Sequence, residues 1–200
     1  MIVLDVETTG LNPDKNSLVS IGALDFYNPE DRFYEECRIW DGAEVLPEAL
    51  VINGYTEEEI SDPSKKTEAE ITLGFWEWLK GKTDITVAGQ NCYVDLQFIE
   101  AALKRAKSKE RMQRRIFDQH SVVVFHMLKR GMTPPIKDRR SALDSDTIMK
   151  YVGIPPEPKP HIAKNGALWE YEALYRLIYD KPGLIEFRDY PIPWLNRATS

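Results

Sequence analysis

The stretch IVLDVETTG, residues 2–10, decides the fold. Its apolar, β-branched start predicts a strand over Ile2–Val6 that ends at Thr-Thr-Gly. Because side chains alternate along a strand, Asp5 and Glu7 share one face. Burying two like charges without a partner costs several kcal/mol, which a divalent cation would offset. Carboxylate oxygens favour Mg²⁺ or Mn²⁺ as that cation; the alternative is an edge strand with a solvated acidic face.

The segments that follow alternate between strand and helix patterns. Turn residues at 28–31, Asn-Pro-Glu-Asp, separate two further strands, predicted at Leu18–Phe26 and Phe33–Ile39 and most simply antiparallel. We then expect a helix at Glu68–Leu79, a short strand at Ile85–Ala88, a helix after it, a strand at Arg115–Phe117, and helices at Ser121–Arg130, Ser141–Tyr151 and Leu168–Ile178. This order predicts an α/β fold: one mixed sheet, with three antiparallel strands and then parallel ones, flanked by helices.

Length and composition fit a single globular domain. The chain has 200 residues, of which 42% are hydrophobic and 29% charged, and its two cysteines lack the paired spacing of a zinc site. The sequence has no apolar run of the ~18 residues that a membrane span needs, and its start does not resemble a signal peptide. We therefore expect a cytoplasmic protein with a domain over residues 1–180. Residues 181–200 would form a tail that packs on this domain or, in a homodimer, on a second copy.

Charge is distributed unevenly between the two halves of the chain. The net charge is −6, but residues 1–100 hold 7 basic and 21 acidic side chains, whereas residues 101–200 hold 19 and 11. The densest basic run, KRAKSKERMQRR over residues 104–115, contains seven cations. Two interpretations stay open for this run: a solvated helix face, or a surface that steers phosphate backbones toward the acidic half.

Two motifs carry a resemblance to a known family. The string LDVETTGL, residues 4–11, and the string GQNCYVDLQFI, residues 89–99, resemble the first and second motifs of the DEDD (DnaQ-like) superfamily of 3′–5′ exonucleases. The resemblance extends to about residue 178 and implies a ribonuclease-H-like domain. In the second motif Asn91 and Asp95 stand four residues apart. Taken alone, Asp95 would be an ordinary acidic residue in the first turn of a helix.

The third motif of the family has one departure here. In the histidine branch (DEDDh) a His is followed after four residues by an Asp; here His161 and Ala163 match, but Gly166 stands at the Asp position. No packing or turn requirement for this glycine is evident from the sequence. Three explanations stay open: an inactivated variant of an enzyme, a natural protein that binds without cleaving, or a substitute ligand from Asn165 or Glu170. If the missing Asp impairs catalysis, Gly166→Asp should raise metal-dependent nuclease activity.

The resemblance also implies roles for the matching residues. The expected reaction is two-metal hydrolysis of a phosphodiester at a 3′ end, which releases a 5′-nucleotide. Two Mg²⁺ or Mn²⁺ ions would be held as follows: Asp5 bridges both, Glu7 binds the first, and Asp95 serves the second. His161 would act as the general base.

The family pattern further implies a substrate cleft beside Asp5. A single-stranded DNA or RNA 3′ end would meet Thr8, Thr9 and Asn91, with Leu11 wedged against the terminal base and Tyr55 or Ile52 on the opposite side. For Leu11 the alternative is a simple core anchor. The second functional hypothesis is a catalytically weak or inactive module that binds nucleic-acid ends or a protein partner.

Overall fold

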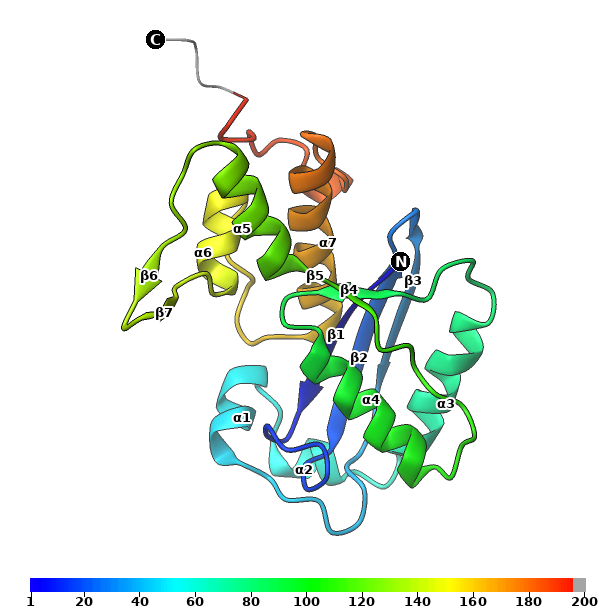
Figure 1. Ribbon diagram of the computed structural model, residues 1–200. Coiled ribbons are helices and arrows are strands. Elements are labelled where there is room, and N and C mark those ends of the chain that lie inside the picture. The colour runs from blue at the N-terminus through cyan, green and yellow to red at the C-terminus, as the bar shows by residue number, and fades with distance from the viewer. Residues whose placement is uncertain (196–200) are drawn as a thin grey trace.

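A five-stranded mixed sheet forms the centre of the molecule. The computed structural model describes residues 1–195 and places the strands in the order β3-β2-β1-β4-β5 (Figure 1). The strands are β1 (Ile2–Thr8), β2 (Leu18–Asp25), β3 (Asn28–Glu36), β4 (Val87–Gly89) and β5 (Ile116–Asp118). β1, β2 and β3 pair antiparallel, while β4 pairs parallel with both β1 and β5. This topology confirms the predicted fold class.

Helices cover both faces of the sheet. They are α1 (Pro47–Asn53), α2 (Glu57–Ser61), α3 (Glu68–Leu79), α4 (Tyr93–Arg105), α5 (Gln119–Lys129), α6 (Ser145–Val152) and α7 (Ala163–Tyr179), with a 3₁₀ turn at Ile185–Phe187. A two-stranded hairpin, β6 (Ile136–Lys137) with β7 (Arg140–Ser141), connects α5 to α6 in the chain and projects to one side of both helices (Figure 1). Within residues 1–195, no helix is both long and apolar enough to cross a membrane.

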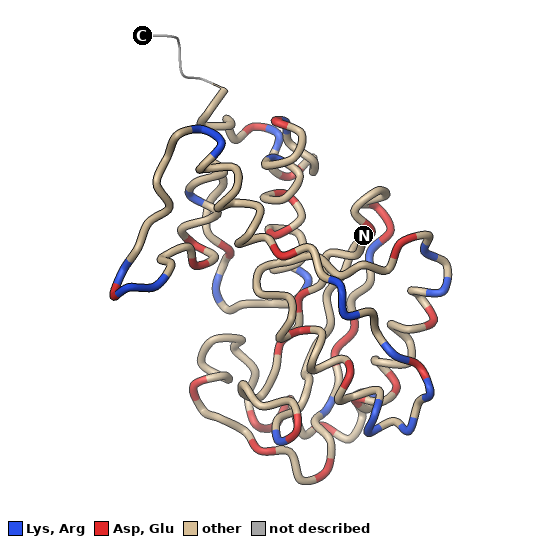
Figure 2. Tube along the Cα trace, viewed as in Figure 1, with Lys and Arg blue, Asp and Glu red and all other residues tan. Residues whose placement is uncertain are grey.

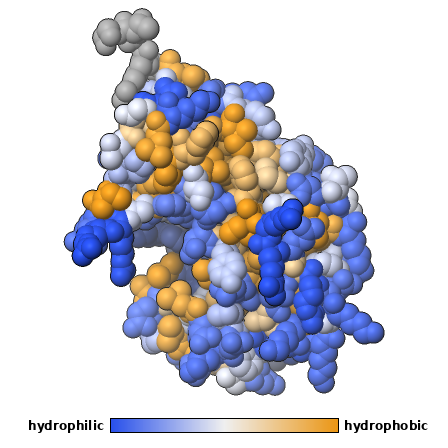
Figure 3. Space-filling model, in the orientation of Figure 1, coloured by the Kyte–Doolittle hydropathy of each residue, from blue (hydrophilic) through white to orange (hydrophobic). Residues whose placement is uncertain are grey.

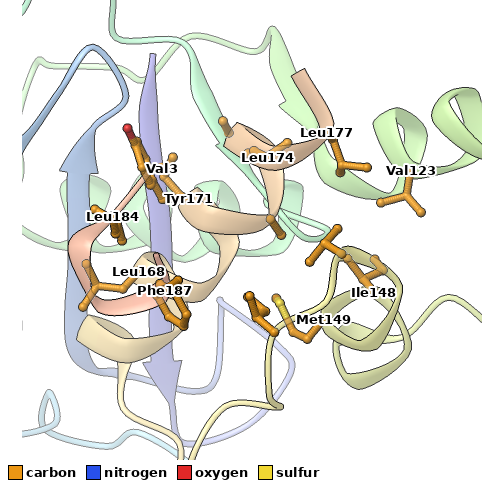
Figure 4. Packing of buried hydrophobic residues seen from close by; sticks show 14 of the residues in the cluster. Val3, Val123, Ile148, Met149, Leu168, Tyr171, Leu174, Leu177, Leu184 and Phe187 are labelled. Atoms are coloured by element: carbon orange, nitrogen blue, oxygen red, sulfur yellow. The ribbon is translucent and has the colours of Figure 1, made fainter. Parts of the chain in front are cut away.

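Two hydrophobic cores lie on opposite faces of the sheet. On β1 the side chains of Ile2 and Leu4 join the core under α3 and α4, whereas Val3 joins the core under α5, α6 and α7. Figure 4 shows this second core, which includes Val3 of β1 and Tyr171 and Leu174 of α7. Because alternate residues of a strand share a face, the positions after Val3 that point toward α7 are Asp5 and Glu7.

The first turn of α7 crosses the sheet unusually closely. Gly22 on β2 pairs in register with Asp5, and a Cβ atom on Gly22 would stand 2.1 Å from the carbonyl oxygen of Ala163. Only a residue without a side chain allows this approach. Gly22 therefore lets the start of α7 lie directly over β1 and β2, next to the acidic positions of β1.

The segment after α7 is held by a buried ion pair. Arg176 and Glu172 are both fully buried and pair through Nε and Oε1 at 2.6 Å. Arg176 also donates to the carbonyl oxygens of Val152 and Phe187. Farther along, Trp194 is buried with its ring 4.5 Å from that of His126. The described part of the predicted tail thus packs on its own chain; residues 196–200 lie outside the described residues.

Several predicted boundaries differ from the structure. The third strand begins at Asn28, not at Phe33, because Asn28 and Pro29 belong to the strand and the turn is Phe26-Tyr27. β3 is an edge strand, where a proline leaves no sheet hydrogen bond unmade. The helix predicted from Ser141 begins at Ser145, since Asp144 caps it by accepting from the N–H of Thr147. Helix α7 begins at Ala163, earlier than predicted.

Candidate active site

The candidate site lies where the end of β1 meets the starts of α4 and α7. A cavity of about 150 Å³ opens there. Its walls come from β1, α6, α7 and the segment before α7: Asp5, Val6, Glu7, Ser145, Met149, Glu157, His161, Gly166, Trp169 and Glu170. The structure therefore brings three of the four predicted catalytic side chains to one cavity wall, and Asp95 lies directly behind it.

Asp95 ties the second motif to the first. It sits in the first turn of α4, is 9% exposed, and its Oδ1 accepts a hydrogen bond from the backbone N–H of Val6 at 3.0 Å. Val6 lies between Asp5 and Glu7 in the chain, so this bond holds α4 against the acidic strand. The helix start also favours a negative charge there.

The three predicted metal ligands affect one another's ionisation. Burial, followed by the charge of Glu170 and then that of Asp95, raises the pKa of Asp5 well above its usual value. Burial and nearby carboxylates raise the pKa of Glu7 to about 8. Burial raises the pKa of Asp95 to about 7, against the opposing effect of its hydrogen bond from Val6. Confined carboxylates of this kind repel one another, and a nearby cation would reverse the shifts.

His161 stands at the edge of the cavity and is paired with a carboxylate. Its Nδ1 lies 3.8 Å from Oε2 of Glu157, and its backbone N–H donates to the carbonyl oxygen of Ile52 at 3.0 Å. Glu157 has a side chain that is 10% exposed, and its Oε1 accepts from the N–H of Ile162. Sequence reasoning missed Glu157, because a proline-rich segment has no periodicity that could place its side chain.

Glu170 is a further carboxylate of the site. It is 7% exposed, and its Oε2 has no hydrogen-bond partner within residues 1–195. Burial and the charge of Asp95 raise the pKa of Glu170 well above its usual value. Gly166, one turn earlier on α7, faces Asp5: a Cβ atom there would stand 2.1 Å from Asp5 Oδ2. Asn165, the other candidate substitute ligand, does not line the cavity.

The donor chemistry of the site fits an ion that prefers oxygen ligands. Five carboxylates gather here, because, besides burial, the charges of Asp95 and Glu157 both contribute to the raised pKa values of Asp5, Glu7 and Glu170. One buried oxygen of Glu170 is also unpartnered within residues 1–195. In the same residues no three His, Cys, Asp or Glu side chains are already gathered around one point as a metal shell.

The predicted substrate residues of the first motif have different environments. Leu11 is 84% exposed, so it is not a core anchor. Thr8 is half-buried and its hydroxyl donates to the carbonyl oxygen of Gly10. Thr9 is fully buried, where its hydroxyl donates to the carbonyl oxygen of Glu44 and accepts from the N–H of Ser17. The backbone of Thr9 is used as well, because its N–H donates to the carbonyl oxygen of Ser17 and its carbonyl oxygen accepts from the N–H of Leu46. The side chain and the backbone of Thr9 thus both hold the loop together.

Asn91 and Tyr55 lie outside the carboxylate cavity. Asn91 is exposed in the turn before α4, with a left-handed backbone (φ 54°), and its N–H donates to Oδ2 of Asp118. Tyr55 joins α1 to α2, and Lys65 lies 5.1 Å from the centre of its ring. Burial raises the pKa of Tyr55 to about 12. Their roles toward a substrate stay predictions.

Comparison with protein families gives the assignment. A family model described as Exonuclease (RNase_T) matches residues 2–163. The chain belongs to this exonuclease family. The match confirms the resemblance to the DnaQ-like exonuclease superfamily that the motifs indicated, whereas the histidine branch stays a prediction. No curated protein sequence matches the chain.

Solved structures with the same fold include several of exonuclease I. The E. coli enzyme in complex with a dT13 oligonucleotide has a TM-score of 0.69 and 16% identity and covers 88% of this chain. The zinc-ion-bound complex of E. coli ExoI with single-stranded DNA has a TM-score of 0.70 and 16% identity over 90% of this chain. A moderately thermophilic exonuclease I from Methylocaldum szegediense reaches 0.72 and 20% over 90%.

These structures are much longer proteins. The exonuclease-family chain spans 40% of the length of each of the three. At such low identity the likeness establishes the fold alone, and the family assignment rests on the match over residues 2–163.

Proposed function

We propose that this chain is a metal-dependent 3′–5′ exonuclease that hydrolyses phosphodiester bonds at the 3′ ends of single-stranded DNA or RNA and releases 5′-nucleotides by a two-metal mechanism. One observation carries the proposal: Asp5, Glu7 and Asp95, from two distant stretches of an exonuclease-family chain, share one confined site. Such clustering of carboxylates with raised pKa values is typical of catalytic sites.

Each side chain has a distinct part in this proposal. Bound at Asp5, Glu7 and Asp95, Mg²⁺ or Mn²⁺ would activate the attacking water and stabilise charge on the departing oxygen. His161 presents Nδ1 to Glu157, which leaves Nε2 as the ring atom that takes the proton of the water. Glu157 orients the imidazole ring, just as a third side chain orients the general base in many hydrolases.

The surface beside the cavity suits a single strand. Figure 3 shows a hollow between the β6–β7 hairpin and the part of the molecule that contains α1. On the α1 side, three large apolar side chains are exposed, those of Leu11, Val51 and Ile52. Exposed apolar groups can contact the faces of unpaired bases, which a duplex hides within its stack.

The opposite rim of this hollow is basic. Lys137, Arg139 and Arg140 are exposed on the β6–β7 hairpin, where Figure 2 shows basic residues, and none of their side chains makes a hydrogen bond or close ion pair within residues 1–195. Asp138 and Arg139 both have a left-handed backbone (φ 50° and 65°), which forms the tight turn. Unpaired cations facing a cleft are suited to contact the phosphates of the same strand.

A second candidate function rests on Gly166. The family position that normally holds a metal-binding Asp has no side chain here, which favours a module that binds 3′ ends with little or no cleavage. The presence of His161 beside Asp5 and Glu7 argues against this binding-only function, because a module that only binds 3′ ends does not need a general base.

The experiment that separates these functions uses a 5′-labelled single-stranded DNA 20-mer and its RNA counterpart. The protein is incubated with each oligonucleotide in Mn²⁺, with and without chelator, beside an Asp5→Asn variant. A ladder of products that shorten from the 3′ end, lost with chelator and reduced at least about 100-fold by Asp5→Asn, supports the exonuclease. Binding without shortening in the presence of Mn²⁺ would instead establish the binding module.

A further inference from the structure

We propose that Glu170 supplies the carboxylate that the family places at position 166, as a ligand for the divalent cation held by Asp5. The inference rests on the proposed function and identifies the ligand set of this chain's own site. It makes Gly166 and Glu170 a matched pair in which the carboxylate has moved one helical turn along α7.

The position of Glu170 on α7 is the first support. Residues four apart on a helix lie on the same face, so Glu170 projects beside Gly166 and toward the sheet. Both residues line the 150 Å³ cavity together with Asp5 and Glu7. A carboxylate one turn farther along the helix, on a side chain longer by one methylene, can therefore reach the same cavity.

The environment of Glu170 is the second support. The residue is only 7% exposed, and its Oε2 has no partner within residues 1–195. Buried oxygens are almost always hydrogen-bonded, and an exception indicates a missing ion or water, or a catalytic role. Gly89 also makes room for this oxygen, because a Cβ atom at Gly89 would stand 2.6 Å from Glu170 Oε2.

A second buried glutamate on the same helix shows the contrast. Glu172 is fully buried, but its Oε1 accepts from Arg176 and its Oε2 accepts from the N–H groups of Gly183 and Leu184. Every oxygen of Glu172 is thus used to hold the chain together. Glu170, two residues away, forms no ion pair with any described residue and keeps one oxygen unused, which is the state expected of a ligand and not of a structural residue.

The other carboxylate and amide near the third motif are less suited to this role. Glu157 accepts from the N–H of Ile162 and faces the ring of His161, so its two oxygens already have neighbours. Asn165 is half-buried and lies outside the cavity walls. Of these candidates, only Glu170 is buried at the cavity with an oxygen that no described residue contacts through a hydrogen bond.

The test is equilibrium Mn²⁺ binding to the full chain, measured by calorimetry and by electron paramagnetic resonance of free Mn²⁺. We compare the wild type with Glu170→Gln, with Glu170→Asp and with Asn165→Ala as the matched control on the same helix. Glu170→Gln should weaken Mn²⁺ binding at least about tenfold, because glutamine keeps the shape of the side chain but loses its charge. Glu170→Asp should weaken binding by a smaller factor, because aspartate keeps the carboxylate. Asn165→Ala should bind Mn²⁺ about as tightly as the wild type.

Circular dichroism and thermal melting establish that each variant is folded. If Glu170→Gln does not fold, the comparison of Mn²⁺ affinity is made between the wild type and Glu170→Asp. Equal Mn²⁺ affinity in the wild type and in both Glu170 variants would overturn the inference, and so would an absence of Mn²⁺ binding in the wild type. Weakened binding in the variants together with no cleavage by the wild type would support the ligand role while defeating the proposed exonuclease. Cleavage by the wild type together with unchanged Mn²⁺ affinity in the variants would support the proposed exonuclease and defeat the ligand role of Glu170.

Discussion

The carboxylate of Asp5 occupies the place where a side chain at Gly166 would begin. A Cβ atom built on Gly166 would stand 2.1 Å from Asp5 Oδ2 and 2.6 Å from Asp5 Cγ, closer than any packed atoms approach. The sequence offered no packing reason for a glycine in the first turn of α7. The structure provides one, because Gly166 leaves room for the acidic group on β1.

This contact predicts an unusual outcome for Gly166→Ala. Replacing a glycine within a helix by alanine ordinarily stabilises by up to ~1 kcal/mol. At Gly166, however, the new methyl group must displace the Asp5 carboxylate, so Mn²⁺ affinity and nuclease activity should each fall at least about tenfold. Calorimetric Mn²⁺ binding and a cleavage assay on labelled oligonucleotides measure the two effects.

Gly74→Ala is the control for that substitution. Gly74 lies within α3, and a Cβ atom there would meet nothing within 4 Å. It should therefore raise the melting temperature and leave activity unchanged. Wild-type Mn²⁺ affinity in Gly166→Ala would show that Asp5 can turn away at no cost and would contradict the steric argument.

The same contact changes what is expected of Gly166→Asp. From the sequence alone, restoring the family aspartate should raise activity. In the structure, the Cβ atom of that aspartate would meet Asp5 just as the alanine would, and a sixth carboxylate would join the five already in the site. The structure therefore predicts no gain over the wild type in Mn²⁺-dependent cleavage, and a measured increase would restore the expectation from the sequence.

The basic hairpin makes a prediction about salt dependence. Replacing Lys137, Arg139 and Arg140 together by glutamine should weaken binding of a single-stranded oligonucleotide. The slope of log Kd against log salt should also decrease by ~0.7 for each phosphate that is no longer neutralised, up to about 2 in total. Fluorescence anisotropy in chelator, where no cleavage occurs, measures this slope over a range of salt concentrations.

A matched triple variant tests the competing basic surface. Lys104, Lys107 and Lys109 are all exposed near the end of α4, and Lys104 lines a groove with Arg111 and Arg114. The basic run is therefore not one solvated helix face, since α4 ends at Arg105. Replacing these three lysines by glutamine should leave the slope unchanged; a decrease here, with none for the hairpin variant, would place the strand along α4.

The parts of the fold that could be predicted depend on local signals. Helix α3 has the bounds that the sequence predicts, because Thr67 and Glu70 form a capping box that fixes its start. The alternation along β1 likewise places Asp5 and Glu7 on one face, since side chains repeat every two residues of a strand. Each of these features is decided by residues close together in the chain.

The features that escaped prediction depend on distant contacts. The need for glycine at position 166 arises from Asp5, far away in sequence, and the burial of Glu157 arises from a loop that only the folded chain positions. The β6–β7 hairpin has two residues per strand, too few to show a periodic pattern. The local propensity of a sequence segment contains no information about contacts between residues far apart in the chain.

The buried pair of Arg176 and Glu172 predicts a large loss of stability. Arg176→Met would leave Glu172 buried without its cation and would remove two donors to backbone carbonyls. We expect the free energy of unfolding to fall by about 3–5 kcal/mol, measured by urea denaturation. Replacing both residues, as Arg176→Met with Glu172→Gln, should destabilise less than Arg176→Met alone; equal losses would argue against a charge effect.

Acid should weaken the contact between α5 and the segment after α7 through His126. The Nδ1 of His126 lies 2.7 Å from the hydroxyl of Tyr151, and its ring packs on Trp194. Burial first, and then the charge of Arg130, lowers the pKa of His126 in the folded state. A lowered pKa means that the stability contribution of His126 is complete above its unfolded pKa of about 6.5 and is lost as the pH falls below that value.

The comparison that isolates this effect is between the wild type and His126→Gln. Glu7 and Asp95 have raised pKa values, so their protonation stabilises the folded chain as the pH falls and partly masks the histidine. Both proteins carry those carboxylates, and their contribution cancels in the difference. Urea denaturation is measured at several pH values over roughly pH 5 to 7, the range around the ordinary histidine pKa. As the pH falls, the wild type should lose stability relative to His126→Gln, so that its tryptophan fluorescence changes at a lower urea concentration. Parallel curves would show that His126 does not titrate differently in the folded chain.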